Sequence, residues 1–292
     1  MAGKVNTAIF PVAGFGTRVL PATKSFPKEM LPVVERPLIH YAVAEAVEAG
    51  IEKIVFVTGR NKQALEDYFD IAYELDRTLA DRGKEDVRAS LRDFLLEPGR
   101  IICVRQMEAL GLGHAVWCAR NVIDDGPVAI VSPDDLVKAP VGCVKQLVDA
   151  HAKTGGNVVA VMDVPREHTN RYGILDTDEP DGDLVPVKGL VEKPDPAEAP
   201  STLSIIGRYV LMPEVFAELA RHETGAGGEI QLTDAMAKLI GRQPFHGLRF
   251  DGDRFDCGTK IGWLEANLAF GLDHPELGQE FTGIVRRYAK QI

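Results

Sequence analysis

The chain has 292 residues, of which 45% are apolar and 26% are charged, and this balance suits a globular protein with one large core or two modest ones. Its formal net charge of −10 argues against a protein that binds the phosphate backbone of nucleic acids, because such proteins carry basic patches or tails. Small phosphorylated ligands remain compatible with this charge, since one site needs only a few local cations.

The sequence lacks the marks of secretion and of membrane insertion. Residues 1–6 are polar and lack the apolar core of a signal peptide, and no apolar run approaches the roughly 20 residues of a membrane helix. The cysteines form no C-x-x-C pair and have no histidine at metal-ligand spacing, so we interpret them as reduced thiols. They are Cys103, Cys118, Cys143 and Cys257. We therefore expect a cytoplasmic protein with neither a membrane nor a nucleic-acid partner.

In the first half of the chain, apolar runs rich in Val and Ile alternate with segments of helical period. Strands are expected at residues 7–12, 53–57, 101–104, 128–131 and 157–164. Helices are expected at 40–49, from 61 onward with one apolar face through residue 79, and at 81–95, 115–120 and 141–152. This β-α-β order predicts an α/β fold with a mostly parallel sheet.

After residue 164 the elements become shorter and turn-rich segments separate them. Strands are expected at residues 184–192, 203–211 and 245–250, and a further short strand before residue 256. Helices are expected at 214–220, 232–240 and 261–272, followed by a tail helix that ends at 292. With no repeat and no low-complexity linker, the sequence predicts a single domain over residues 1–292.

A glycine-rich loop follows the first expected strand. Gly14 and Gly16 let backbone N–H groups approach a phosphate, and Arg18 adds a bidentate cation. The loop is not a dinucleotide-binding fingerprint, because Val19 replaces the third glycine and Pro21 obstructs a helix start. It is not a Walker loop either. A strand followed by a glycine turn also arises for structural reasons alone, so the phosphate interpretation stays open at this point.

Lys28 follows this loop, between Pro27 and the apolar pair Met30-Leu31. Its apolar neighbours hold it near the edge of the sheet, where an ammonium group suits the neutralisation of a phosphate. The alternative is an ordinary surface lysine.

Carboxylates follow two expected strands. Asp134 and Asp135 come just past a buried strand, at the end where open α/β sheets bind ligands, and a carboxylate there suits a hard cation. Asp256 follows another short strand. Each of these residues also has a structural alternative, as a turn or helix-cap residue. Gln106, followed by Gly111, offers an amide that suits a pyrimidine edge, or it simply faces solvent.

Several motifs together closely resemble the bacterial UTP–glucose-1-phosphate uridylyltransferases. The stretches 26–32 (Phe-Pro-Lys-Glu-Met-Leu-Pro) and 109–114 (Ala-Leu-Gly-Leu-Gly-His) are characteristic of that branch, whereas the glycine loop with its lysine fixes only the wider superfamily of sugar nucleotidyltransferases. The resemblance runs from about residue 7 to 267. It also includes the motifs at 14–18, 36–40, 134–135, 172–173, 191–194 and 228–234.

The resemblance implies a Rossmann-like three-layer α/β/α fold with a mixed central sheet, UTP and glucose 1-phosphate as substrates, and Mg²⁺ as cofactor. It also implies a homotetramer built as a dimer of dimers. Residues to about 155 would bind the nucleotide, and the rest would bind the sugar phosphate. The catalytic cations would be Arg18, Lys28 and Lys193. The nucleotide contacts would be Ala13, Gly14, Glu29, Gln106 and Gly111. The sugar-phosphate contacts would be Asp135, Gly173, Glu192, Lys193 and Gly207. The metal ligands would be Asp134 and Asp256.

One residue departs from the family pattern: Ser132 stands where the family usually has an apolar side chain, and we expect it to alter packing only. Three rival interpretations remain. The first is a thymidylyltransferase with the same chemistry, and the second is a nucleotide-sugar-binding regulator that has lost activity. The third, an NAD-dependent dehydrogenase, is poorly supported because of Val19 and Pro21.

Overall fold

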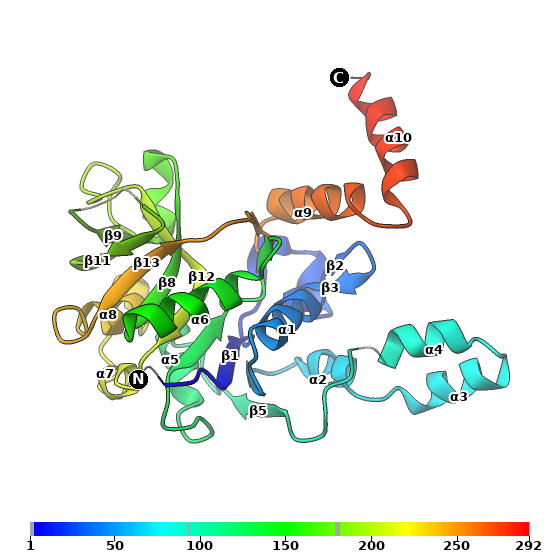
Figure 1. The fold of residues 1–292 in the computed structure, drawn as a ribbon, viewed down its shortest axis with the longest axis horizontal. Coiled ribbons are helices and arrows are strands. Elements are labelled where there is room, and N and C mark those ends of the chain that lie inside the picture. The colour runs from blue at the N-terminus through cyan, green and yellow to red at the C-terminus, as the bar shows by residue number, and fades with distance from the viewer. Residues whose placement is uncertain (1–2, 93, 179–181, 292) are drawn as a thin grey trace.

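The computed structural model describes residues 3–92, 94–178 and 182–291, so residue 93 of the expected helix 81–95 and residue 292 of the tail helix lie outside the described residues. Within these ranges, a central sheet of ten strands organises the fold (Figure 1). Eight of its strands follow the order β10-β13-β8-β12-β6-β1-β4-β5. Their bounds are β1 (Thr7–Pro11), β4 (Lys53–Thr58), β5 (Ile101–Arg105), β6 (Val128–Val131), β8 (Asn157–Asp163), β10 (Leu184–Pro186), β12 (Leu203–Leu211) and β13 (Phe245–Arg249).

The sheet is mixed because one long strand reverses its direction. Strands β6, β1, β4 and β5 pair in parallel, and so do β8 and β13. Strand β12 lies between β6 and β8 and is antiparallel to both. Strands β9 (Gly173–Asp176) and β11 (Gly189–Glu192) pair with each other, and β9 also joins β12. The expected mixed, mostly parallel α/β sheet is confirmed.

Helices cover both faces of the sheet, which gives the expected three layers. On one face, Ala8 and Phe10 of β1 belong to a core cluster with apolar residues of α1 (Leu38–Glu48), α2 (Gln63–Phe69) and α6 (Cys143–Thr154). On the other face, Ile9 belongs to a cluster with α5 (Leu112–Cys118), α7 (Val215–Leu219) and α8 (Leu232–Ala237). Because successive strand residues point to opposite faces, a continuous apolar run such as β1 serves both cores.

Two small sheets and a third core cluster stand at one end of the main sheet. Strand β7 (Asp135–Lys138) pairs with β14 (Asp253–Asp256) in a register that sets Asp135 opposite Asp256. Strand β2 (Pro32–Val33) pairs with β3 (Arg36–Pro37). Helix α9 (Lys260–Leu272) packs over them, and the shared core includes Leu31, Leu136 and Ala266.

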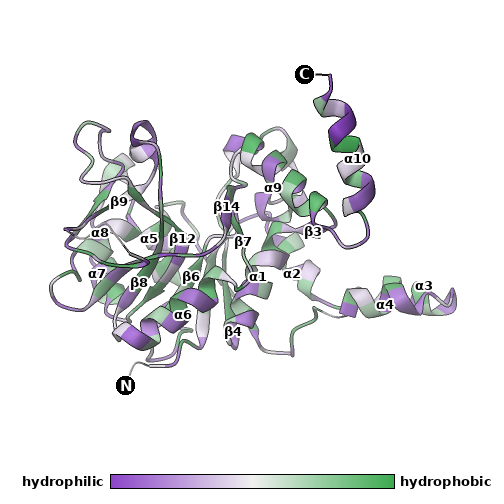
Figure 2. Ribbon diagram, turned by 45° about the horizontal axis from the view of Figure 1, so that its top comes forward, coloured by the Kyte–Doolittle hydropathy of each residue, from purple (hydrophilic) through white to green (hydrophobic). Residues whose placement is uncertain are grey.

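Two parts of the chain project from this body (Figure 1): the hairpin of α3 (Tyr73–Asp81) and α4 (Glu85–Arg92), and helix α10 (Gly278–Ala289). Bands of polar and apolar residues alternate along α4 and α10 (Figure 2). The hairpin buries none of its helical side chains, and Asp76 holds it together by accepting hydrogen bonds from Arg88 and Arg92. Among the described helices, none is both long enough and apolar enough to cross a bilayer.

The predicted elements are largely found with shifted ends, but two predictions were wrong. The single helical face expected from residue 61 to 79 is two helices, because Asp70 adopts an extended conformation and ends α2. Leu75, expected on the buried face, is 47% exposed. The expected strand 184–192 is two strands, since β10 pairs with β13 while β11 turns away to pair with β9. Strands β7 and β9 were not expected.

A buried ion pair links the sheet to its helices. Arg208 of β12 is fully buried, and its Nη2 lies 2.8 Å from Oε2 of Glu45 on α1. Arg208 Nη1 also donates to the carbonyl of Ser132 at 2.8 Å, and Glu45 Oε1 accepts from the backbone N–H of Val144 in α6 at 2.9 Å. One pair of charges therefore connects β12, α1, α6 and the end of β6.

Replacing Glu45 by Ala is expected to lower the free energy of unfolding by about 3–5 kcal/mol, because Arg208 would remain buried without its counter-charge. Urea unfolding measures this change. The control Glu48→Ala removes an exposed carboxylate that accepts from the N–H of Gly142 at 3.0 Å, and it should cost only about 1 kcal/mol. Equal losses in the two variants would contradict the role given to the buried pair.

Candidate active site

A cavity of about 580 Å³ opens beyond the carboxyl end of β6, where residues from both halves of the chain meet. It is lined by many of the residues that the sequence singled out and by several that it did not. The former are Arg18, Asp134, Asp135, Gly173, Glu192, Lys193, Gly207 and Asp256. The latter include Arg171, Gln231, Thr233, Arg254 and Thr259, and Tyr172 of the 172–173 motif also lines the cavity.

The glycine loop brings Lys28 to the edge of the sheet. Gly16 has φ 65°, and a Cβ built on it would lie 3.0 Å from Lys28 Cβ, so a side chain there would crowd the lysine. Thr23 Oγ1 donates to the Gly16 carbonyl at 2.8 Å and fixes the turn. The Lys28 ammonium, on a side chain only 18% exposed, lies 2.5 Å from Asp134 Oδ2. Lys28 is therefore held in place rather than extended into solvent.

Two carboxylates converge on the same point. Arg18 Nη2 lies 3.7 Å from Asp134 Oδ2, and Arg18 Nη1 lies 3.8 Å from Asp256 Oδ2. A Cβ built on Gly258 would come within 2.8 Å of Asp134 Oδ2 and 2.9 Å of Asp256 Oδ1. Glycine at this position therefore leaves room where both carboxylates can reach one cation.

This donor set suits Mg²⁺, which usually takes one or two protein carboxylates and completes its shell with water and phosphate oxygens. In the ranges that the structure describes, no group of three or more His, Cys, Asp or Glu side chains is placed to hold a metal. A site of two carboxylates would leave the remaining positions to water and phosphate oxygens.

The charges in this cluster shift one another's pKa values. Burial works to raise the pKa of Asp134, but the Lys28 ammonium and then Arg18 hold it below its usual value. Burial works to lower the pKa of Lys28, but Asp134 and Glu29 raise it above its usual value. Asp256 differs, because burial and the charge of Asp135 raise its pKa. Near neutral pH, Lys28 is therefore charged and paired with an ionised Asp134.

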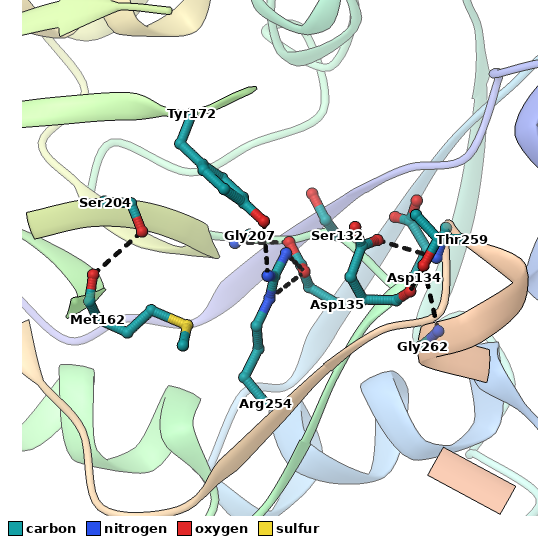
Figure 3. Close-up of polar contacts among 12 residues, drawn as sticks. Ser132, Asp134, Asp135, Met162, Tyr172, Ser204, Gly207, Arg254, Thr259 and Gly262 are labelled. Atoms are coloured by element: carbon teal, nitrogen blue, oxygen red, sulfur yellow. Dashed lines mark hydrogen bonds and ion pairs between the residues drawn. The ribbon is translucent and has the colours of Figure 1, made fainter. Parts of the chain in front are cut away.

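Asp135 belongs to a second cluster, next to the first (Figure 3). Arg254 Nε donates to Asp135 Oδ1 at 2.6 Å, Arg254 Nη2 contacts the same oxygen, and Arg254 Nη1 donates to the Tyr172 hydroxyl at 3.1 Å. The backbone N–H of Gly207 donates to Asp135 Oδ2 at 3.0 Å. Both Asp135 oxygens therefore have partners within the chain, and Arg254 supplies their counter-charge.

Glycine at 207 is required by this packing. A Cβ there would lie 2.5 Å from Ser132 Cβ and 2.7 Å from Asp135 Oδ2. Ser132, the residue that departs from the family pattern, thus rests directly against the Gly207 backbone. Sequence reasoning did not assign Arg254 a role, and its only signal was its position two residues before Asp256.

Opposite this cluster, the β9–β11 pair supplies Gly173, Glu192 and Lys193. Glu192 stands opposite Gly173 in the register, and a Cβ on Gly173 would lie 3.3 Å from Glu192 Oε2. Lys193 has φ 48°, its backbone N–H donates to the Tyr172 carbonyl at 2.9 Å, and its side chain is 46% exposed. The strand pairing therefore places one carboxylate and one cation on the same wall, where Lys193 Nζ lies 3.3 Å from Glu192 Oε1.

The expected nucleotide contacts lie around this cavity rather than on its walls. Gln106 follows β5, and Gly111 caps α5 with φ 106°, next to the wall residues Leu112 and Glu229. The side chain of Glu29 is fully buried, and its Oε2 accepts a hydrogen bond from Lys62 Nζ at 2.8 Å. Glu29 therefore braces the Lys28 turn against the segment after β4.

Ala13 and Gly14 form the start of the glycine loop. Gly14 is exposed, and a Cβ built on it would meet nothing within 4 Å. The Ala13 carbonyl lies 3.2 Å from the Cβ position of Gly59, so the loops after β1 and β4 are packed closely together. The backbone beyond Ala13 is therefore open to a ligand.

Comparison with known proteins gives a consistent result. The model of the nucleotidyl transferase family matches residues 8–270. The chain is 57% identical to a UTP–glucose-1-phosphate uridylyltransferase of Komagataeibacter xylinus over 89% of this chain and 92% of that protein. A UTP-bound UGPase from Acinetobacter baumannii superposes with a TM-score of 0.89 at 42% identity, covering 96% of this chain and 98% of that one. A UDP-glucose pyrophosphorylase complexed with UDP-glucose superposes with a TM-score of 0.83 at 40% identity, covering 91% of this chain and 98% of that one.

Proposed function

We propose that this chain transfers the uridylyl group of UTP to glucose 1-phosphate. The chain belongs to the nucleotidyl transferase family and, within it, to the UTP–glucose-1-phosphate uridylyltransferases. The products would be UDP-glucose and pyrophosphate. The observation that carries this proposal is the convergence of Arg18, Lys28 and two aspartates at one side of a cavity whose other wall carries Lys193. Similar proteins that bind UTP and UDP-glucose support it.

The reaction needs no nucleophilic side chain and no covalent intermediate, because glucose 1-phosphate brings its own ionised oxygen. Its main barriers are the repulsion between two polyanions and their alignment at the α-phosphorus of UTP, so positioned cations supply most of the catalysis. Arg18 and Lys28 would stabilise the triphosphate and the departing pyrophosphate. Lys193 would hold the attacking phosphate.

Asp134 and Asp256 would hold Mg²⁺, since both carboxylates lie within 3.8 Å of the Arg18 guanidinium and both approach the Cβ position of Gly258. When bound, the ion would neutralise phosphate charge and make the α-phosphorus more electrophilic. In the structure Lys28 neutralises Asp134, and a phosphate that draws the ammonium toward itself would free this carboxylate.

The sugar would lie between the second cluster and the β9–β11 pair. Glu192 would accept hydrogen bonds from sugar hydroxyls, and the bare backbone at Gly173 and Gly207 would let the ring approach. Asp135 would contribute mainly by fixing Gly207, because Arg254 already occupies its other oxygen. In this arrangement the chain forms one domain, with the nucleotide bound by residues up to about 155 and the sugar phosphate by the remainder.

We further propose that the chain assembles as a tetramer, a dimer of dimers, as the family resemblance implies. The projecting helices support this, because they expose apolar side chains that a neighbouring copy would cover. These include Tyr73, Val87 and Leu91 on the α3–α4 hairpin and Tyr288 on α10.

An activity matrix tests the proposed reaction. Pyrophosphate release is measured with UTP, dTTP or CTP against glucose 1-phosphate or galactose 1-phosphate, with and without Mg²⁺. We expect the highest kcat/KM with UTP, glucose 1-phosphate and Mg²⁺ together. Faster turnover with dTTP would identify a thymidylyltransferase instead. Tight UDP-glucose binding without any turnover would identify a regulatory protein.

Lys28→Ala is expected to lower kcat by roughly 10²-fold or more, the scale for loss of one preorganised charge stabiliser. Lys84→Ala, which removes an exposed lysine on the α3–α4 hairpin, is the matched control and should leave kcat unchanged. Near-normal turnover of the Lys28 variant would remove this residue from the mechanism.

Asp134→Asn is expected to raise the Mg²⁺ concentration for half-maximal activity by at least about tenfold, because even indirect partners of a metal contribute that much to its binding. The control Asp86→Asn removes an exposed carboxylate on α4 and should not change the titration. If the metal titration of the Asp134 variant matched that of the parent protein, the metal site would have to lie elsewhere.

A further inference from the structure

Gln106 lies at the end of β5 with its side chain almost completely enclosed. Its backbone N–H donates to the carbonyl of Thr58 at 2.9 Å, and the residue is 8% exposed. Its side-chain Nε2 lies 3.1 Å from the carbonyl oxygen of Gly111 and 3.0 Å from Nδ1 of His114. Both directions in which an amide NH₂ group can donate are therefore occupied by atoms of the same chain.

The contact with Gly111 identifies which atom of the Gln106 amide is the nitrogen and which is the oxygen. A backbone carbonyl can only accept, so the amide atom that faces it must be the nitrogen. The second N–H of that nitrogen then points at His114 Nδ1, which must accept. His114 is therefore the neutral tautomer with its proton on Nε2.

The acceptor end of the amide is left open. Within the described residues, Gln106 Oε1 makes no hydrogen bond, and it is not among the buried polar atoms that lack a partner. An atom that is neither paired nor sealed inside the protein can be reached by a ligand. What Gln106 offers to a ligand is thus a hydrogen-bond acceptor.

The ring of His114 is held in the orientation that this arrangement needs. It stacks on Trp117, with ring centroids 5.9 Å apart and an interplanar angle of 25°, and meets His222 edge-on. Its Nε2 lies 3.9 Å from the sulfur of Cys118, a weak acceptor one helical turn away. Burial, followed by the neighbouring His222, lowers the pKa of His114, in keeping with a neutral ring.

The other anchor of the amide is equally fixed. The Gly111 carbonyl also accepts from the N–H of Ala115 in the first turn of α5, at 3.1 Å. On either side of it, Gly113 N–H donates to Ile230 O at 2.9 Å, and Ile230 N–H donates to Leu110 O at 2.8 Å. A Cβ on Gly113 would lie 2.7 Å from Ile230 O, so glycine is needed for this close approach.

We infer that His114 is a positioning residue that locks the Gln106 amide with its oxygen facing the nucleotide base, so that the site selects bases with an N3–H donor. This inference rests on the proposed function and on the nucleotide contact that the family resemblance implies for Gln106, here taken as a contact with the base of UTP. Uracil and thymine carry a hydrogen on N3, whereas N3 of cytosine is an acceptor and would face the amide oxygen without a proton between them. A 180° flip of the Gln106 amide would break both of its hydrogen bonds within the chain. The free-energy cost of losing them keeps the oxygen toward the base and so maintains the preference for an N3–H donor.

The test compares two variants of His114. His114→Leu removes the acceptor while keeping an apolar side chain of similar reach, and His114→Asn returns a side-chain oxygen close to the position of Nδ1. Calorimetry gives the Kd of each protein for UTP, dTTP and CTP. We expect the Leu variant to lose about tenfold of the preference for UTP over CTP, and the Asn variant to recover most of it.

A second nucleotide pair serves as the internal control. UTP and dTTP share the N3–H group, so their affinity ratio should be the same in all three proteins, as should the KM for glucose 1-phosphate. A general loosening of the site would change these values as well. A folded Leu variant with an unchanged UTP-to-CTP ratio would overturn the inference, and so would a parent protein that binds the two nucleotides equally.

The tautomer can be measured in the parent protein, which keeps the inference testable if the variants do not fold. Nitrogen NMR of labelled histidine should show His114 with an unprotonated Nδ1, and a proton on Nδ1 would overturn the inference. A parent protein that binds UTP over CTP but releases no pyrophosphate would refute the proposed function and leave the role of His114 intact.

Discussion

The contact between Lys28 and Asp134 is the interaction on which the rest of the site depends. It joins residues 106 positions apart in sequence, and it places a cation and an anion 2.5 Å apart in a largely enclosed setting. Each charge offsets the cost of burying the other, because an unpaired buried ion costs several kcal/mol. The backbone of Asp134 also accepts from the N–H of Cys257 at 2.8 Å, so three distant segments meet at one point. The cluster of cations and carboxylates follows from this meeting.

Strand β12 connects the cavity to the protein core. Its neighbouring residues Gly207 and Arg208 lie where the pairing of β12 with β8 is irregular, between Ile205 and Tyr209. Gly207 donates its N–H to Asp135 in the cavity, while Arg208 reaches Glu45 beneath the sheet. Between them, Ser132 donates its N–H to the Gly207 carbonyl at 2.8 Å and accepts from Arg208 through its own carbonyl. The floor of the cavity is therefore fixed by the same hydrogen bonds that hold the core.

The sequence predicted most accurately those elements whose secondary structure does not depend on the segments that pack beside them. Strands β6 and β12 have the expected bounds, because a buried strand reads as a continuous apolar run whatever lies beside it. Leu75 shows the opposite case, because its helical spacing was correct but the hairpin that carries it leaves the body after Phe69. Strand β7 was not expected, since only its pairing with β14 makes those four residues a strand.

The same division applies to the candidate site. Residue types and motifs in the sequence determined the α/β class, the family and most of the charged groups of the cavity, because glycine loops, strand-end carboxylates and isolated lysines carry a local signal. Only the tertiary structure decided how these groups pair. In the structure Asp135 accepts a hydrogen bond from Arg254, Glu29 accepts one from Lys62, and the amide of Gln106 is hydrogen-bonded to His114. Such pairings depend on distances between segments far apart in the chain, and those distances are set when the core packs.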